Sequence, residues 1–130
     1  MNGAGRTHVL TIEVTGRPAT FATAGERPWK EAIRRAIGEA KVVPTNGRFA
    51  VALEFRLGQA RSANEVWDLD NLINPTLDAM EGVLGLRPWR GMPQPADDRV
   101  DEIRATKRQP MPGETAGARI EVWLIEIDTG

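Results

Sequence analysis

The sequence predicts a single α/β (α+β) domain in which two main helices pack on a small mixed β-sheet. Polar and apolar residues alternate strictly over Arg48–Leu57, which is the period of a half-buried strand. Apolar residues recur every three or four positions over Pro28–Ala40, which is the period of an amphipathic helix. Arg119–Ile127 is apolar enough to be a strand covered on both faces for part of its length. No repeat or low-complexity linker divides the 130 residues, so we expect one domain.

The N-terminal half of the chain predicts the order strand, helix, strand. Residues 1–7 are polar and glycine-rich, and we expect them to form a loose end. His8–Val14 alternates apolar and polar residues and predicts the first strand. Pro28 suits the first position of a helix, where its missing N–H costs nothing, and the helix is expected to end near Ala40. A turn then leads into the strand at Arg48–Leu57.

A second helix is expected to begin at Asn71 or at Asn74 and to end at Gly85. Asn74 followed by Pro75 resembles an N-cap residue followed by proline at the first helical position. Glycine directly after the last periodic residue is a common C-terminal signal. Four apolar residues share one face of this helix: Ile73, Leu77, Met80 and Leu84.

The last third of the chain predicts two further strands. Leu86–Ala96 contains three prolines and a glycine and is expected to be irregular. Val100–Thr106 is moderately strand-like, and Arg108–Gly117 is expected to be a hairpin or a loop. With Arg119–Ile127 the predicted order is therefore strand, helix, strand, helix, strand, strand.

Composition excludes several kinds of site. The chain has no cysteine, which rules out disulfides and thiolate metal sites, and its one histidine makes a histidine-rich zinc site untenable. Its 17 Lys and Arg against 18 Asp and Glu give a net charge of −1, which neither indicates nor excludes a surface that binds nucleic acid. There is no apolar run of about 18 residues and no signal-like N-terminus, so we expect a cytoplasmic protein with no membrane partner.

Four aspartates form the candidate site. Asp68 and Asp70 precede the second helix, and Asp97 and Asp98 precede the next strand. If Trp67–Asp70 is the frayed end of a strand, alternation places the first two carboxylates on one face. Close carboxylates repel unless a cation lies between them, and carboxylates without histidine favour a hard cation of the magnesium type. The competing interpretation is that Asp68 and Asp70 only cap a helix and keep the surface soluble.

Three motifs resemble the RusA family of Holliday-junction resolvases. They are Asp68-Leu69-Asp70-Asn71-Leu72, then Leu77-Asp78-Ala79-Met80, then Asp97-Asp98 followed by Lys107. The resemblance implies a RusA-like fold and a homodimeric, magnesium-dependent endonuclease that resolves four-way or other branched DNA by paired symmetric nicks in recombination and repair. It implies that Asp68, Asp70 and Asp97 are the catalytic residues and hold Mg²⁺, for which Mn²⁺ can substitute. Counting back from Lys107 favours Asp97 as the third ligand, whereas matching the acidic pair itself favours Asp98.

The chain departs from the family pattern at three places. The family has a lysine four residues after the second aspartate, where this chain has Asn74. The segment before Asp68 is Asn64-Glu65-Val66-Trp67 rather than a basic run, and Leu86–Ala96 is longer than the family loop. These departures leave open a relative that binds branched nucleic acid without efficient cleavage, or a magnesium-dependent phosphoesterase with another substrate.

Four residues are candidates for contacting nucleic acid. Arg87, Trp89 and Arg90 place an aromatic ring between two cations, a combination that could stack on an unpaired base. Lys107 matches the family lysine and could contact a phosphate. The competing interpretation is that Trp89 packs into the core and the two arginines are merely solvated.

Overall fold

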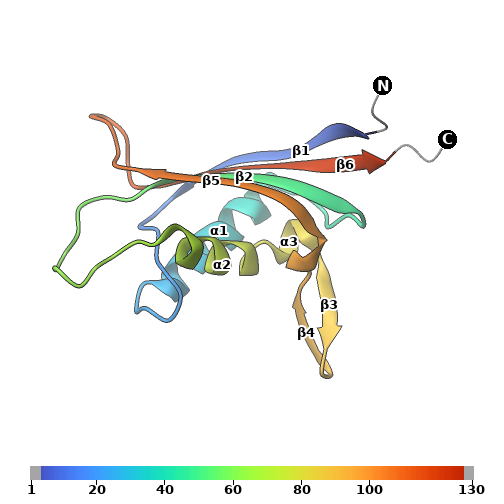
Figure 1. The fold of residues 1–130 in the computed structure, drawn as a ribbon, viewed down its shortest axis with the longest axis horizontal. Helices are drawn as coiled ribbons and strands as arrows, with labels where there is room; N and C mark the ends of the chain where they lie inside the picture. Colours follow the sequence, from blue (N-terminus) through green and yellow to red (C-terminus); the bar gives the residue numbers. More distant parts are fainter. Residues whose placement is uncertain (1–3, 128–130) are drawn as a thin grey trace.

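The computed structural model describes residues 4–127 and shows one compact α+β domain, which confirms the predicted fold class. A mixed four-stranded sheet forms one layer, the helices form a second layer on one face of it, and a two-stranded hairpin projects away from both (Figure 1). In chain order the elements are β1 (Ala4–Thr15), α1 (Glu26–Ala40), β2 (Arg48–Arg56), α2 (Leu69–Asp78), α3 (Glu81–Leu84), β3 (Leu86–Trp89), β4 (Met92–Pro95), the 3-10 turn η1 (Asp97–Arg99), β5 (Val100–Arg108) and β6 (Gly117–Ile127).

The strand order β1-β6-β2-β5 makes the C-terminal strand a central one. β6 runs antiparallel to both β1 and β2, whereas β2 and β5 are parallel. A parallel pair needs a crossover connection, and this one carries α2, α3 and the β3–β4 hairpin. β5 is left at one edge of the sheet with α2 below it (Figure 1). The crossover therefore determines where every candidate aspartate lies.

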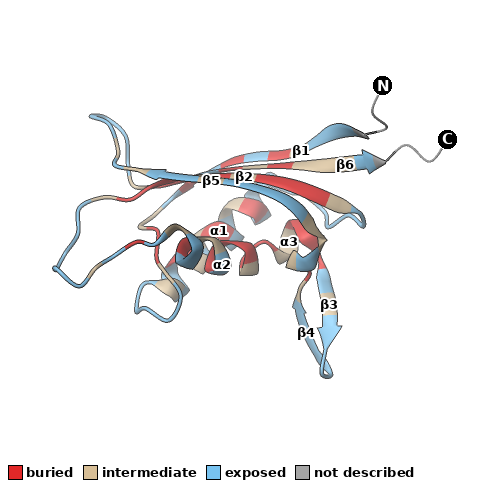
Figure 2. Ribbon diagram, in the orientation of Figure 1, coloured by how far each residue is buried: buried red, intermediate tan, exposed pale blue. Residues whose placement is uncertain are grey.

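The core lies between the sheet and the helices (Figure 2). The alternation in β2 sends one set of side chains inward against Trp29, Ile33 and Ile37 of α1, and all of these are buried: Phe49, Val51, Leu53 and Phe55. The opposite face of the sheet has no helix over it (Figure 1). The prediction that the last strand is covered on both faces is therefore wrong, because Arg119 on β6 points to solvent.

The first strand is longer than predicted. β1 begins at Ala4 and pairs with β6 from Ala4↔Ile127 to Thr15↔Gly117, so residues 4–7 are not a loose end. Residues 1–3 lie outside the described part of the chain. Residues 5–7 are exposed, so pairing with β6 rather than burial of apolar side chains orders this end of the strand.

The second helix starts earlier and ends earlier than predicted. α2 runs from Leu69 to Asp78, and a separate short helix, α3, follows, so the expected single helix to Gly85 is wrong. Pro75 lies inside α2 and has no N–H to donate to the carbonyl of Asn71. The backbone N–H of Phe21 donates to that carbonyl instead, at 3.1 Å, so a neighbouring loop satisfies the acceptor that proline leaves free.

The segment predicted to be irregular is a hairpin. Arg90 and Gly91 have φ values of 50° and 79°, which is the conformation of a two-residue type I′ turn, between the paired residues Trp89 and Met92. Three prolines are tolerated because the hairpin has only two strands, so proline can face solvent where no ladder hydrogen bond is needed.

A buried hydrogen bond joins α1 to α2 and gives a test of the packing. The Trp29 indole Nε1 donates to Thr76 Oγ1 at 3.1 Å, and that hydroxyl donates to the Leu72 carbonyl at 2.8 Å. Thr76→Val keeps the volume but leaves the indole N–H unpaired, so we expect a loss of roughly 1–3 kcal/mol in unfolding free energy. Urea denaturation would measure it, with the exposed Thr106→Val as a control expected within about 0.5 kcal/mol of wild type. Equal costs for the two variants would contradict this packing.

Candidate functional site

Trp67 fixes the segment that carries the first two aspartates. Its indole Nε1 donates to the Pro18 carbonyl at 3.0 Å, and the Arg17 guanidinium lies over its ring, 5.0 Å from the centroid. Its backbone carbonyl accepts a hydrogen bond from Lys107 Nζ on β5. The β1–α1 loop and the edge strand thus hold the residue before Asp68 from two sides.

Asp68 and Asp70 lie at the N-terminus of α2 and are both exposed. Asp68 is the N-cap residue with extended φ and ψ of −74° and 135°, and its side chain makes no capping hydrogen bond. Asp70 is already in the first helical turn. The expectation that Trp67–Asp70 is the end of a strand is therefore wrong, and the two carboxylates lie at the start of a helix instead.

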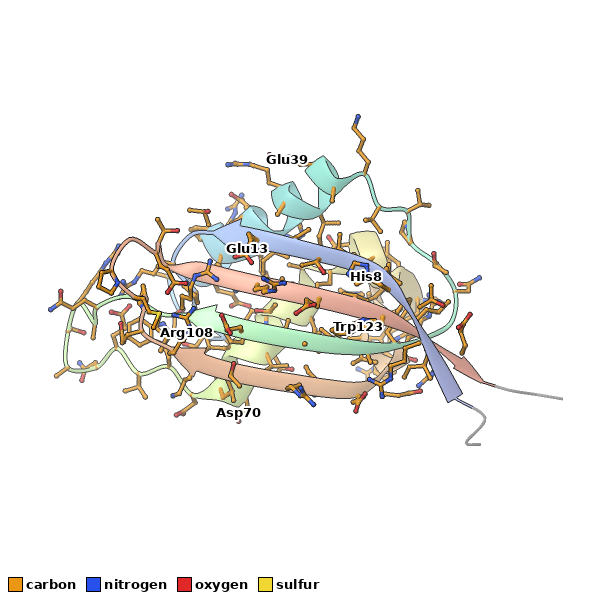
Figure 3. The ribbon with its side chains drawn as sticks, turned by 90° about the horizontal axis from the view of Figure 1, so that it is seen from above. His8, Glu13, Glu39, Asp70, Arg108 and Trp123 are labelled. Carbon is orange, nitrogen blue, oxygen red and sulfur yellow. The ribbon has the colours of Figure 1, made fainter. Side chains whose placement is uncertain are left out.

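The two carboxylates are unusual in having no charged partner. Thirteen of the acidic side chains in residues 4–127 make a salt bridge to an arginine or lysine. Asp68 and Asp70 make none within that range, and the only others that make none there are Glu39 and Glu126. Asp70 lies beside the β5 edge, on the opposite side of the molecule from Glu39 (Figure 3). Two exposed carboxylates, two residues apart in the chain, are therefore without a cationic partner in the described residues.

Asp97 and Asp98 lie elsewhere, on η1 before β5. Arg87 Nε is 2.8 Å from Asp98 Oδ1, and Arg87 Nη2 is 3.9 Å from Asp97 Oδ1. The 2.8 Å contact is an ion pair rather than a hydrogen bond, because Arg87 Nε has no acceptor at suitable geometry in the described residues. η1 lies at the start of β5, whereas Lys107, which contacts Trp67, lies near the end of that strand. β5 has nine residues with a rise of about 3.3 Å each, so most of its length separates the two positions. No three acidic or histidine side chains in residues 4–127 are placed to hold one metal ion.

A second acidic group forms around Asp78 at the C-terminal end of α2. Lys30 Nζ lies 3.6 Å from Asp78 Oδ2 and 3.4 Å from Glu26 Oε2. Burial raises the pKa of Asp78 above its ordinary value, and the charges of Asp97 and Glu26 add to the rise while Lys30 opposes it. The structure therefore brings Asp97 to Asp78 rather than to Asp68 and Asp70.

The residues proposed to contact nucleic acid also lie in two places. Lys107 is near the Asp68 end of α2, with Nζ exposed enough to use its remaining donors. Trp89 and Arg90 lie at the tip of the hairpin beyond the other end of α2 (Figure 1). Trp89 is 52% exposed, so the alternative that it packs into the core is wrong.

A cleft of about 720 Å³ lies beside Trp67, between the β1–α1 loop and the segment that leads to α2. Arg17 crosses it to bind Glu65, and the backbone N–H of Arg61 donates to the same carboxylate at 2.6 Å. The Arg61 hydrogen bond and Arg17 together lower the pKa of Glu65. The cleft braces the loop before Asp68 and adds Arg61 to the cations near that site.

Sequence reasoning missed Asp78, Lys30 and Arg17 as parts of the charge arrangement. Asp78 follows Asp70 by two helical turns, so its position at the far end of the same helix could have been predicted if the helix had been expected to start at Leu69. Lys30 and Arg17 contact residues 48 positions away in the chain, and no local pattern reports such a contact.

Comparison with known proteins adds no family assignment. No protein-family model matches the chain, and no curated protein matches its sequence. Within residues 4–127, none of the helices has the length and apolar character needed to cross a bilayer.

The raised pKa of Asp78 gives a test of the charge arrangement. A folded-state pKa above the unfolded value favours the protonated form, so stability is lost as pH rises through the folded pKa. Asp78→Asn cannot ionise, and Lys30 keeps Glu26 as a partner, so we expect the variant to be more stable than wild type at neutral pH. The advantage should shrink below the ordinary value of 3.8, and urea midpoints across pH would measure it. A variant that is less stable at neutral pH would show that the Lys30 pair outweighs burial.

Proposed function

We propose that the protein is a magnesium-dependent endonuclease of the RusA type that cuts branched DNA, with Asp68 and Asp70 as its metal ligands. The observation that carries the proposal is the exposed, unpaired pair of carboxylates at the start of α2, in a chain whose other acids nearly all have a cationic partner. The resemblance of Asp68–Leu72 and Lys107 to the family motifs supports the same assignment.

The donor set fits Mg²⁺ without a third protein carboxylate. Magnesium keeps several of its waters and is commonly bound through one or two carboxylates together with substrate phosphate oxygens. Asp68 and Asp70 offer hard oxygen ligands at an accessible edge, and no arginine or lysine in the described chain competes for them. When bound, the ion supplies charge neutralisation at the scissile phosphate and a water of lowered pKa.

The chain's own groups would position the DNA strand. Lys107 holds the Trp67 carbonyl and so fixes the approach to Asp68, and its remaining N–H groups can face a phosphate. Arg61 lines the cleft beside Trp67 and is a second cation that could contact the strand. The near-neutral total charge is compatible with this arrangement, because 17 basic residues are still present to contact phosphates.

Asp97 and Asp98 enter the metal site only through a rearrangement of η1 or from a second copy of the chain. The proposal retains the homodimer that the resemblance implies, because two-fold symmetry would place two cutting sites on a symmetric four-way junction. Mn²⁺ is expected to replace Mg²⁺, and the proposed setting is DNA recombination and repair in the cytoplasm.

A second candidate function is binding of branched DNA without efficient cleavage. Two observations favour it: neutral Asn74 takes the place of the family lysine on the exposed face of α2, and Arg87 neutralises Asp97 and Asp98. Neither observation touches Asp68 or Asp70. The two functions are separated by cleavage of a labelled four-way junction in Mg²⁺, beside a linear duplex and an EDTA control.

Loss of one proposed ligand gives the direct test. Asp70→Asn should lower junction cleavage by roughly a hundredfold or more, because an amide cannot hold and offset the metal charge. Folding should be unaffected, since Asp70 is exposed and makes no hydrogen bond to another described side chain.

The matched control is Glu39→Gln, which removes another unpaired, exposed carboxylate on the far side of the molecule (Figure 3). It should cut like wild type. Cleavage by Asp70→Asn at the wild-type rate would remove the metal assignment.

Restoring the family lysine tests the second departure. Asn74→Lys places a cation one helical turn from Asp70, where it can offset charge that develops on the phosphate, and we expect cleavage about tenfold faster. Asn46→Lys makes the same change of net charge in an exposed loop outside α2 and should leave the rate unchanged. A rate for Asn74→Lys no higher than that of wild type would show that the site does not use this position.

A further inference from the structure

The β3–β4 hairpin is the most exposed ordered element of the molecule. It projects past the helix layer and contacts little besides its own base, and nearly all of it is exposed (Figure 2). Trp89 and Met92 are paired across the strands at the tip, and they are 52% and 62% exposed. An exposed aromatic side chain on a projecting element indicates a surface that meets a partner.

The hairpin is held rigidly rather than loosely. The Ala96 N–H donates to the Gly85 carbonyl at 2.9 Å and closes its base. Arg99 Nη1 donates to the Leu84 carbonyl at 2.8 Å and ties the following turn to α3. Arg87 is paired with Asp97 and Asp98, and the type I′ turn fixes the tip. The ring of Trp89 is therefore presented in a defined orientation.

Two guanidinium groups lie over that ring. The Cζ atoms of Arg87 and Arg90 lie 5.6 Å and 5.4 Å from its centroid, which is the distance of a cation–π contact. Arg90 makes no salt bridge within residues 4–127, and Gly85–Ala96 contains no acidic residue. A base that stacks on Trp89 takes the place of a guanidinium group over the ring, and the displaced cation is then free to contact the neighbouring phosphates.

The prolines argue against a protein strand as the partner. Pro88, Pro93 and Pro95 lack the N–H donors that an added strand would need from the hairpin edges. Main-chain augmentation by a peptide, or by the same hairpin of a second copy, is therefore blocked. The partner must be recognised by the side chains at the tip.

We propose that the hairpin is a wedge that stacks Trp89 on unpaired or unstacked bases at the branch point of DNA. The inference rests on the proposed function for its substrate, and it adds that branch recognition is separate from the carboxylates. The tip lies beyond the C-terminal end of α2, whereas Asp68 and Asp70 lie at its N-terminus (Figure 1). In this arrangement the hairpin contacts the bases at the branch point, and the N-terminal end of α2 contacts the DNA backbone.

The test is DNA binding in EDTA, where cleavage plays no part. A four-way junction with 2-aminopurine at the branch point is compared with a linear duplex of the same arm sequence, by titration with wild type, Trp89→Ala and Trp89→Phe. We expect Trp89→Ala to bind the junction roughly tenfold more weakly, to bind the duplex within about twofold of wild type, and to lose the 2-aminopurine signal of unstacking. Trp89→Phe should keep most of the affinity because it keeps an aromatic plane.

The matched control is Phe21→Ala, which removes another aromatic ring that is 62% exposed, on a loop outside the hairpin, and should bind like wild type. Equal loss on junction and duplex, or no loss on either, overturns the wedge. A Trp89→Ala protein that sediments as a smaller species than wild type also overturns it, because the hairpin would then be a self-association arm. If junction binding needs Trp89 but no cleavage follows in Mg²⁺, the wedge proposal is supported and the nuclease proposal is rejected.

Discussion

The fixation of Trp67 is the constraint on which the candidate site depends. Two separate parts of the chain hold this residue: the β1–α1 loop contacts its indole N–H and its ring, and β5 contacts its backbone carbonyl. The next residue is Asp68, whose extended backbone starts α2, so the position of both carboxylates follows from how firmly Trp67 is held. Both carboxylates are exposed and no described side chain bonds to them, so the backbone alone sets where they lie.

One-sided burial of the sheet explains why α2 can carry chemistry. The helices satisfy only the inner face, and the outer face is closed by charge: Glu13 pairs with Arg56 at 3.1 Å, and Arg108 pairs with Glu54 at 3.2 Å (Figure 3). Arg108 also binds Glu114, which lowers the pKa of Glu114 to about 2. On the other face of the sheet, α2 lies below the edge strand β5 and is only half-buried. Its inner face packs through Leu72, Thr76 and Leu77 while its outer face remains free.

Periodicity in the sequence predicted the parts of the fold in which burial decides the structure. The first helix and the strand at Arg48–Leu57 were predicted correctly because their apolar residues repeat at the helical and strand periods. The start of α2 could not be predicted this way, because Pro75 reads as an N-terminal residue until the Phe21 N–H is known to take over the Asn71 carbonyl. The hairpin was missed for a similar reason: its three prolines indicate irregular chain, and only the positive φ at Arg90 beside Gly91 allows the turn. The four candidate aspartates were predicted as one cluster, and residues 4–127 hold no such cluster.

The grouping follows from the direction of the chain. Asp68 and Asp70 open the crossover between β2 and β5, and Asp97 and Asp98 close it, so a crossover that runs back along the sheet must separate them. Sequence motifs record order and spacing but not this direction, which is why three carboxylates of one motif set can lie at two ends of a helix. The salt bridges differ between the two ends of α2. Arg87 pairs with Asp97 and Asp98, and Lys30 pairs with Asp78. Asp68 and Asp70 make no salt bridge within residues 4–127. Within residues 4–127, Asp68 and Asp70 are therefore the two of the four candidate aspartates whose charge no arginine or lysine offsets.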